Sequence, residues 1–203
     1  MEAIEIANKY DAFARFYDWA ELGPELLGLA RLRRKLVRSA AGDVLEVAVG
    51  TGKNIVHYPK DIRLTGVDLS QGTMAKASKR ADRSGLTARF EVMDVTYLGF
   101  AEESFDTVVD TMSLCTFPNP IAALKELGRV CRSAGRILLL EHGRSDRAWL
   151  GGFQDRRARK HAEPLGRHWN REPLRLVEES GLRVVRAERH FFGVFHLIEA
   201  QKG

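Results

Sequence analysis

The stretch "LEVAVGTGKN", residues 45–54, decides how this chain folds. It is an apolar run that ends in a turn containing two glycines. Such a run indicates a buried strand, here Val44–Val49, and the glycines permit the tight turn that follows it. Strands that run into glycine-rich turns are typical of nucleotide-binding proteins, because backbone N–H groups in the turn can approach a ligand. The residues around the turn must therefore identify that ligand.

Two familiar nucleotide motifs do not fit this turn. A triphosphate loop needs G-x-x-x-x-G-K-[ST], but Val47 takes the place of the first glycine and Asn54 that of the hydroxyl residue. A dinucleotide fingerprint needs a small residue at its third conserved position, where the two possible frames give Ile55 or Lys53. The pattern that remains is E-x-x-x-G-x-G, over residues 46–52.

Two acidic residues follow at the expected ends of the next strands. Asp68 closes the run "RLTGVDL", and Asp94 lies in "VMDV". Ligands of parallel α/β sheets bind beyond the carboxyl ends of the strands, so both acids should lie beside the glycine turn. A carboxylate at Asp68 can accept two hydrogen bonds from a ribose diol, and one at Asp94 can accept from an adenine amino group. Together these features predict a site for an adenosine-containing ligand.

The rest of the chain alternates between strand and helix patterns. Further strands are expected at Arg63–Leu69, Ala88–Val95, Phe105–Met112, Arg136–Glu141, Leu182–His190 and Gly193–Ala200. Helices are expected after Ser70 up to Gly85, over Asn119–Arg132, in a basic region near residues 155–163 and over Glu172–Ser180. This order predicts an α/β fold with a mostly parallel seven-stranded sheet, helices on both faces and one antiparallel strand in a terminal hairpin.

Length and composition limit the classes of protein to be considered. The chain has 203 residues, which suits a single domain, and 44% of them are hydrophobic. No apolar run is long enough for a membrane helix, and no secretory signal is expected at the N-terminus. The two cysteines have no metal-site spacing, so neither a metal nor a disulfide framework is expected, and the predicted location is cytoplasmic. The net charge of +5 leaves room for an anionic lipid surface, but no nucleic-acid motif accompanies it.

The glycine turn and the two acids resemble the class I S-adenosylmethionine-dependent methyltransferases over essentially the whole chain. Their first motif is usually (D/E)-x-G-x-G-x-G, and this chain departs from it at Ala48, where glycine is common. The resemblance implies a Rossmann-like fold, S-adenosyl-L-methionine as cofactor and S-adenosyl-L-homocysteine as product. It also makes Asp106, in "SFDTVV", a structural residue. The cofactor contacts that it implies in the motif-bearing strands are Glu46, Ala48, Gly50, Gly52, Asn54, Asp68, Leu69, Asp94, Val95, Thr111 and Met112.

Other segments resemble the UbiE-like members, of the methyltransferase domain 11 type. The N-terminal "YDAFARFYD" is similar to a segment that closes over the cofactor in that group, which makes Tyr17 a further candidate contact. The second half, including "HWNREPLRLVEESGLRVV", is similar to thiol methyltransferase-like and fungal mitochondrial methyltransferase-like proteins. Many of those carry a Gly-Cys pair where this chain has Gly166-Arg167-His168, so properties of that cysteine do not transfer. Bacterial phosphatidylethanolamine N-methyltransferases are also similar, mostly through the first half.

Within the single domain of residues 1–203, three parts have different expected roles. Residues 1–40 form a helical lid, residues 41–142 the cofactor-binding half and residues 143–203 the acceptor side. The segment "PELLGLARLRRKLVRSA" inside the lid is a basic amphipathic helix. Such a helix either lies on a membrane surface or covers the cofactor half with a solvated outer face. The basic stretch "DRRARKHAE" at residues 155–163 leaves the membrane alternative open.

His142 is the candidate catalytic residue, because it ends the fifth strand on the acceptor side and a neutral imidazole can act as a general base. The alternative is a structural histidine. His161, His168 and His190 could line the same pocket, and Cys115 is expected to pack in the core.

The predicted reaction is direct displacement that moves the methyl group to a small or lipophilic acceptor, either a thiol, an amine or a quinol-like ring. One alternative is a phospholipid N-methyltransferase that acts as a peripheral membrane protein. A second is a non-catalytic module that binds S-adenosylmethionine. No nucleic-acid partner is expected, and the sequence does not give the oligomeric state.

Overall fold

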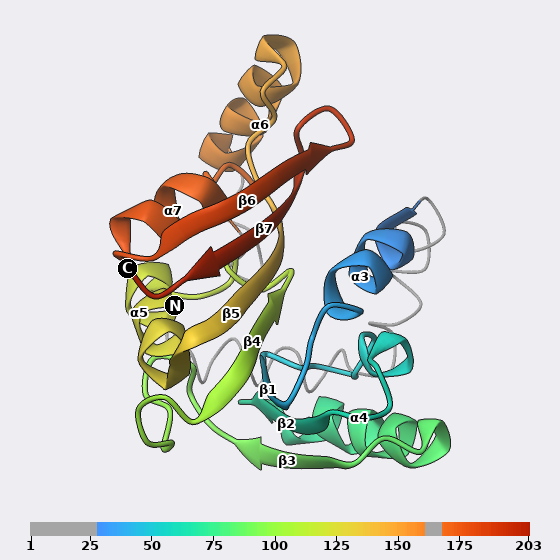
Figure 1. Cartoon of the computed structure of the whole chain (residues 1–203). Coiled ribbons are helices and arrows are strands. Elements are labelled where there is room, and N and C mark those ends of the chain that lie inside the picture. The colour runs from blue at the N-terminus through green and yellow to red at the C-terminus, as the bar shows by residue number, and fades with distance from the viewer. Residues whose placement is uncertain (1–27, 161–167) are drawn as a thin grey trace.

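The computed structural model describes residues 28–160 and 168–203 (Figure 1). The described strands form one sheet of seven, in the order β3-β2-β1-β4-β5-β7-β6. Neighbours from β3 to β5 are parallel, whereas β7 is antiparallel to both β5 and β6. The strands are β1 Asp43–Val47, β2 Arg63–Asp68, β3 Ala88–Val92, β4 Phe105–Thr111, β5 Cys131–His142, β6 Arg183–His190 and β7 Phe195–Gln201. The predicted seven-stranded sheet with an antiparallel last strand is confirmed.

Helices cover both faces of the sheet (Figure 1). They are α3 Ala30–Val37, α4 Gln71–Ser84, α5 Pro120–Val130, α6 Ala148–Lys160 and α7 Pro173–Glu179, with a short 3-10 helix, η2, at Ile55–His57. The side chain of Ser70 caps α4 by accepting from the Thr73 N–H at 3.2 Å, and Gly85 ends it in the left-handed conformation with φ +63°. Both signals were predicted from the sequence.

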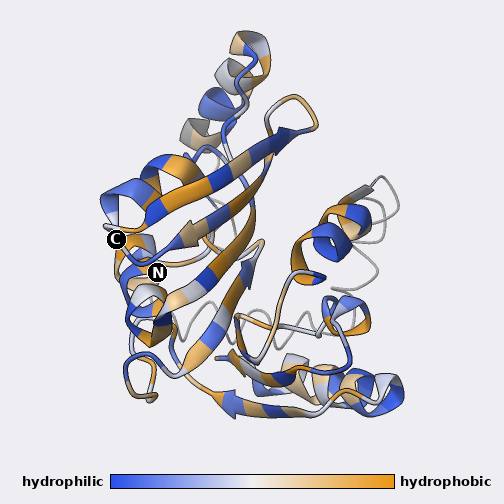
Figure 2. Ribbon diagram, viewed as in Figure 1, coloured by the Kyte–Doolittle hydropathy of each residue, from blue (hydrophilic) through white to orange (hydrophobic). Residues whose placement is uncertain are grey.

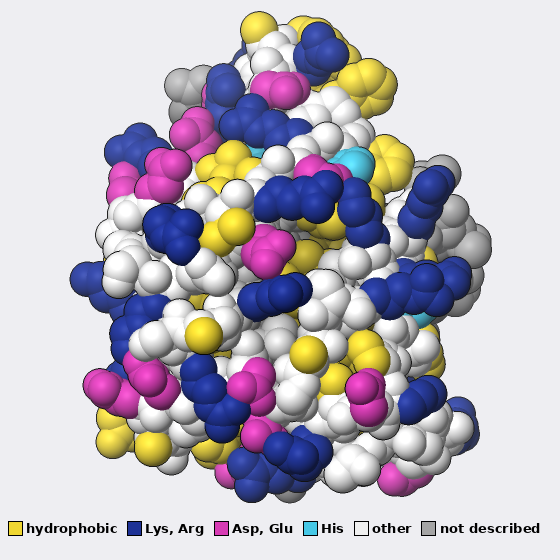
Figure 3. All heavy atoms as spheres, viewed as in Figure 1, with side chains coloured by type: hydrophobic (Ala, Val, Ile, Leu, Met, Phe, Trp, Pro, Cys, Tyr) yellow, Lys and Arg dark blue, Asp and Glu magenta, His cyan; other side chains and the backbone are white. Residues whose placement is uncertain are grey.

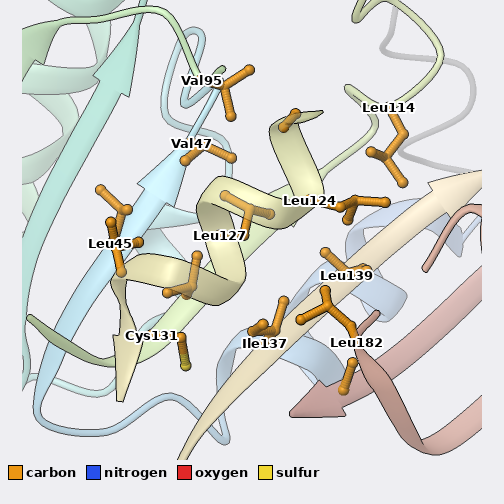
Figure 4. Close-up of a cluster of buried hydrophobic side chains, with 14 of the residues drawn as sticks. Leu45, Val47, Val95, Leu114, Leu124, Leu127, Cys131, Ile137, Leu139 and Leu182 are labelled. Carbon is orange, nitrogen blue, oxygen red and sulfur yellow. The ribbon is translucent and has the colours of Figure 1, made fainter. Parts of the chain in front are cut away.

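Two hydrophobic clusters hold the helices on the sheet. One lies between the sheet and α5 and α7, where Leu124 and Leu127 of α5 meet Leu45, Val47 and other strand residues (Figure 4). The other lies on the opposite face, beneath α3 and α4. Figure 2 shows that hydrophobic residues predominate in the strands of the central part of the sheet, which these two clusters cover. Because the clusters fix both faces, the carboxyl ends of the parallel strands are held in constant positions.

The basic helix of the N-terminal region uses its apolar face inside the protein. Leu29, Leu32, Leu36 and Val37 are all buried in the cluster beneath α3, while Arg31, Arg34 and Lys35 are exposed. Of the two predicted roles, covering the cofactor half is the one this packing supports. Within the described residues, no helix is long and apolar enough to cross a membrane.

Several predicted element boundaries were wrong, each for a local reason. The helix expected to reach Arg132 ends at Val130, because Cys131 is extended (φ −76°, ψ 135°) and pairs with Phe105 of β4. Consequently β5 begins at Cys131 rather than at Arg136. The strand expected to reach Val95 ends at Val92, so Asp94 lies in the loop beyond β3.

Two further strands end earlier than predicted. The strand of residues 44–49 stops at Val47, because Ala48 takes a positive φ of 46°. The fourth strand stops at Thr111, because Met112 takes a positive φ of 63°. Neither residue can continue a strand in that conformation.

Candidate active site

The predicted site residues lie along one edge of the sheet, at the carboxyl ends of β3, β2, β1, β4 and β5. Ala48, Gly50, Gly52 and Asn54 follow β1, whereas Asp68 ends β2 and Leu69 follows it. Asp94 and Val95 follow β3, Thr111 and Met112 lie at the end of β4, and His142 ends β5. The edge is continuous because these five strands are neighbours in the sheet. Tyr17 lies outside the described residues, as does His161.

The loop after β1 has three residues with positive φ, open space at Gly50 and a close contact with α4 at Gly52. Ala48, Gly50 and Gly52 all have positive φ, at 46°, 52° and 76°. A side chain on Gly50 would meet only the Ala48 carbonyl oxygen, at 3.9 Å, so its backbone faces open space. A Cβ on Gly52 would lie 2.5 Å from Ile55 Cδ1 and 2.9 Å from the Ala77 backbone of α4. The loop therefore packs on the protein at Gly52 and leaves room for a ligand at Gly50.

Asp68 fastens this loop to the end of β2. Its Oδ2 accepts from the Gly50 N–H at 2.8 Å, and its Oδ1 accepts from the Ser70 N–H at 2.8 Å. These two bonds hold the carboxylate at the end of β2, beside the open backbone of Gly50. Asp94 has a comparable local role, since its Oδ1 accepts from both the N–H and the hydroxyl of Thr96, at 2.8 and 2.7 Å.

Glu46 supports the loop from beneath through side-chain contacts. Its Oε1 accepts from Asn54 Nδ2 and its Oε2 accepts from the Tyr58 hydroxyl, both at 2.8 Å. Burial of the carboxylate raises the pKa of Glu46 to about 7, against the lowering effect of these two hydrogen bonds and of the Arg33 charge. Glu46 is buried, and its two contacts tie β1 to the residues around η2.

Arg33 of α3 joins the same network, a role that the sequence analysis missed. Its Nη1 donates to Thr111 Oγ1 at 2.7 Å and to Asn54 Oδ1 at 3.3 Å. Asn54 Nδ2 also donates to Thr111 Oγ1, at 3.0 Å. One signal in the sequence could have revealed Arg33, because it is a charged residue four positions after Leu29, on the apolar face of the helix. In the structure it is buried there.

Two buried acids on the other face of the sheet were also missed. Asp110 of β4 accepts from the Ser113 hydroxyl, and Glu141 of β5 accepts from the Ser113 N–H at 3.1 Å. Asp110 Oδ2 and Glu141 Oε2 are buried without a hydrogen-bond partner in the described part of the chain. Burial raises the pKa of Asp110 to about 7. It also raises that of Glu141 well above its ordinary value, and the charge of Asp110 adds to this shift.

His142 is buried against an aromatic ring. Its imidazole stacks on Trp169, with ring centroids 4.7 Å apart and an angle of 25° between the planes. The loop after β4 lies beside this stack, since the Cys115 carbonyl accepts from the His168 N–H at 2.9 Å. Arg171 Nη1 donates to the Leu114 and Phe117 carbonyls of the same loop. This side of the site therefore has an aromatic and apolar wall with one imidazole in it.

Two other sequence candidates lie away from this wall or serve the fold. Asp106, at the start of β4, accepts from the Asp43 N–H at 2.8 Å and pairs with Arg132, which agrees with its expected structural role. His190 ends β6 and pairs with Glu188, 3.1 Å away. In the described ranges, no cluster of three His, Cys, Asp or Glu side chains is arranged to hold a metal ion.

The chemistry of this edge suits an adenosine-containing cofactor. The open face at Gly50 leaves space that a Cβ would enter, and beside it lies the Asp68 carboxylate, a group of the acceptor type that binds ribose hydroxyls. Asp94 and Val95 lie next along the edge, where an adenine would need an acceptor and an apolar neighbour. Thr111 and Met112 lie on the other side of the loop, toward His142. Asn54, which stands where a triphosphate loop has its hydroxyl residue, donates its Nδ2 to Glu46.

Comparisons with known proteins identify the family. The model of the methyltransferase domain matches residues 45–139. The phosphatidylethanolamine N-methyltransferase of Cereibacter sphaeroides is 31% identical over 187 residues, which cover 91% of each chain. The mitochondrial methyltransferase OMS1 of Saccharomyces cerevisiae is 28% identical across the whole of this chain, which spans only 47% of that relative.

A solved structure agrees with this assignment at the level of the fold. A SAM-dependent methyltransferase from Thermotoga maritima superposes with a TM-score of 0.72 at 23% identity, and the match covers 98% of this chain and 100% of that one. The chain belongs to the S-adenosylmethionine-dependent methyltransferases.

Proposed function

We propose that this methyltransferase acts on a small or lipophilic acceptor, namely a thiol, an amine or a quinol-like ring. The observation that carries the proposal is the aromatic and apolar wall at the end of β5, beside the strand ends that carry the proposed cofactor contacts. His142 and Trp169 stack there, next to the buried Leu114, Cys115 and Phe117 of the loop after β4. An apolar, aromatic wall favours an acceptor that gains from leaving water over a large polar macromolecule.

In this proposal, residues at different strand ends contact different parts of the cofactor. Gly50 offers open backbone, Asp68 the ribose acceptors and Asp94 the acceptor for the adenine amino group. Glu46, Asn54 and Thr111 hold the loop in place through their shared hydrogen bonds. When bound, S-adenosylmethionine supplies an electrophilic methyl group, and direct displacement leaves S-adenosylhomocysteine. The protein aligns the two reactants and excludes water, which is worth several orders of magnitude in rate.

His142 is the proposed base for an acceptor that must lose a proton. Its Nδ1 or Nε2 would take the proton from a thiol or a hydroxyl as the new bond to carbon forms, or from an ammonium before the freed lone pair attacks. An acceptor that reacts in its neutral form would need no base, and His142 would then only shape the wall with Trp169. The two roles differ in what happens when the ring nitrogens are removed.

We expect His142→Phe to lower turnover by about 10²–10⁴-fold if His142 is the base, because a ring that stacks on Trp169 remains but the proton acceptor is gone. Cofactor affinity should change by less than about twofold, since His142 is not among the proposed cofactor contacts. Turnover and cofactor binding of His190→Phe, on β6, serve as the control. Unchanged turnover in His142→Phe would leave His142 a structural residue.

Asp68→Ala should weaken cofactor binding by about 1.5–3 kcal/mol, the usual worth of hydrogen bonds to a charged group. The variant loses the ribose acceptors and also releases the Gly50 N–H that fixes the loop. Isothermal titration with S-adenosylhomocysteine measures the loss. Asp61→Ala, at an exposed acid just before β2, is the matched control and should bind as the parent does. Equal affinity in the Asp68 variant would show that the ribose lies elsewhere.

A phospholipid amine is the second candidate acceptor. It is favoured by the similarity to the Cereibacter sphaeroides phosphatidylethanolamine N-methyltransferase, which extends over 91% of both chains. In this version of the proposal the protein is a cytoplasmic enzyme that works at an anionic membrane surface. A non-catalytic cofactor-binding module is the third possibility, since folds of this kind also host other functions.

Cofactor labelled on its methyl group separates these candidates. The protein is incubated with it and a cell extract, and the label is partitioned between organic, aqueous and macromolecular fractions. Label in the organic fraction supports a lipid, quinol or thioether product, which mass spectrometry then identifies. Label confined to protein or nucleic acid would overturn the acceptor class, and no transfer despite tight cofactor binding would favour the non-catalytic module.

A further inference from the structure

Helix α6 turns polar, half-buried side chains toward the protein, unlike an ordinary surface helix, which turns an apolar face inward. On the inner side, Gln154 Nε2 donates to the Gly143 carbonyl at 3.0 Å, and Gln154 Oε1 accepts from the Ser145 N–H at 2.7 Å. Asp155 pairs with Arg144 at 3.0 Å. Hydrogen bonds and an ion pair therefore hold the helix on the protein.

The outer face of α6 carries aromatic and basic side chains instead. Trp149 is 69% exposed and Phe153 is 53% exposed, and both lie on one side of the helix because they are four residues apart. Arg156 and Arg157 continue the same side one turn further on and are also exposed. Exposing two large aromatic rings to water costs free energy that the fold could have avoided by rotating the helix.

The turn between β6 and β7 adds two more exposed aromatic rings beside the start of α6. Phe191 is 46% exposed and Phe192 is 65% exposed. The Phe192 carbonyl accepts from the Ser145 hydroxyl, and Arg189 lies 3.9 Å from Asp146, so the turn is tied to the residues that precede α6. Figure 3 shows hydrophobic side chains beside Lys and Arg side chains at this end of the molecule.

These rings are not a random scatter of exposed residues. Of the five strongly exposed aromatic side chains in the described part of the chain, only Tyr97, in the loop after β3, lies elsewhere. We call Trp149, Phe153, Phe191 and Phe192, together with Arg156 and Arg157, the aromatic surface. β3 and β6 are the two outer strands of the sheet, so Tyr97 and the aromatic surface lie on opposite sides of the molecule.

We propose that the aromatic surface docks the protein on an anionic phospholipid bilayer. Aromatic rings prefer the boundary between water and acyl chains, and arginines next to them attract lipid phosphates. A helix with Trp and Phe followed by Arg on its outer side has the pattern of an interfacial helix. Helix α3 is unsuited to this role, because its leucines are packed in the core.

Docking at this surface would bring the bilayer close to the acceptor side of the site. Gln154 Nε2 also approaches the Trp169 carbonyl, at 3.4 Å, and Trp169 stacks on His142. The inner side of α6 thus contacts the wall of the site, while its outer side faces the proposed membrane. This deepens the proposed function by giving a lipophilic acceptor a source, but the docking itself requires no methyl transfer.

Vesicle co-sedimentation tests the proposal with the full chain and without cofactor or acceptor. The vesicles are phosphatidylcholine alone or an equal mixture with phosphatidylglycerol, at low and high salt. The aromatic variant is Trp149→Gln/Phe153→Gln/Phe192→Asn, in which Asn tolerates the left-handed backbone at position 192 (φ +58°). Phe191 is kept because it packs on Phe195, with ring centroids 5.7 Å apart. The charge variant is Arg156→Gln/Arg157→Gln, and Tyr97→Gln is the control.

The expected result is binding of the parent to mixed vesicles that weakens with salt. The aromatic variant should bind the mixed vesicles at least about tenfold more weakly than the parent. The charge variant should lose the preference for anionic lipid, and Tyr97→Gln, at a ring that is 82% exposed, should bind as the parent does. Thermal unfolding checks that each variant is folded.

Three results would overturn the proposal: no binding of the folded parent to either vesicle, equal binding of the aromatic variant, or equal loss in the Tyr97 control. Self-association without lipid that the aromatic variant abolishes would also overturn it, in favour of a second copy of the chain. Because no methyl transfer is measured, docking can succeed where the lipid acceptor fails, and the labelled-cofactor experiment decides the latter alone.

Discussion

Replacing Gly52 with alanine should lower the free energy of unfolding by about 2–4 kcal/mol. The new methyl group would lie 2.5 Å from Ile55 Cδ1 and 2.9 Å from both the Cα and the Cβ of Ala77. The Ile55 side chain can move, but the Ala77 backbone belongs to α4 and cannot shift without lifting the helix. A positive φ of 76° adds strain that an alanine bears poorly. Urea denaturation measures the loss.

Gly85→Ala is the matched control for this prediction. Gly85 also has a positive φ, of 63°, but a Cβ there would meet nothing within 4 Å. Gly85→Ala should therefore lower the free energy of unfolding by about 1 kcal/mol, the cost of the backbone conformation alone. If both variants lose the same amount of stability, the contact between the glycine loop and α4 accommodates a methyl group at Gly52 without further cost. If Gly52→Ala alone is strongly destabilised, cofactor affinity should fall with it, since the loop must move.

The second large effect is a loss of stability as the pH rises. The pKa of Glu46 is about 7 in the folded protein, against 4.5 for an unperturbed glutamate. A raised pKa means that the folded state binds a proton more tightly than the unfolded chain. The stabilisation is therefore complete below pH ~4.5 and is lost as the pH rises through ~7, a change of about 3 kcal/mol. Asp110 and Glu141 shift in the same direction and add to the trend.

Denaturation by urea at several pH values between 5 and 8 measures this dependence. Glu46→Gln should flatten the curve by about 3 kcal/mol, because its side chain has the same shape and does not titrate. Glu178→Gln, at an exposed position on α7, is the control and should leave the slope unchanged. An unaltered slope in Glu46→Gln would mean that the carboxylate is ionised in the folded protein throughout this range.

The fold was predictable because its signals are local. The apolar run before Gly50 gave β1, and the capping residue Ser70 and the terminator Gly85 placed α4. The order of strands and helices then allowed few arrangements other than the one observed. The predicted ends of elements were wrong where the backbone conformation of one residue sets the end, as at Ala48, Met112 and Cys131. Those conformations depend on contacts between distant segments, which the pattern does not encode.

The candidate site divides in the same way. Gly50 and Asp68 were predicted because one follows a strand, the other ends one, and both match a known motif. Arg33 was missed because it precedes the motif region by many residues and reaches the site only across the packed face of α3. Asp110 and Glu141 were missed because a buried acid inside an apolar strand looks like a local irregularity until two strands are paired. The contact roles of the site residues stay predictions until cofactor affinity is measured in variants such as Asp68→Ala.

The strand order has a consequence for how the chain is made. β7 lies between β5 and β6, although it is synthesised after both. Until β7 has left the ribosome, β6 lacks its neighbour in the sheet and the exposed edge of β5 stays open. The nascent chain can therefore complete the parallel part of the sheet early, but it must hold two unpaired edges through the stage before β7 is synthesised. That stage is the period in which chaperone protection should matter most, because open strand edges invite misassociation.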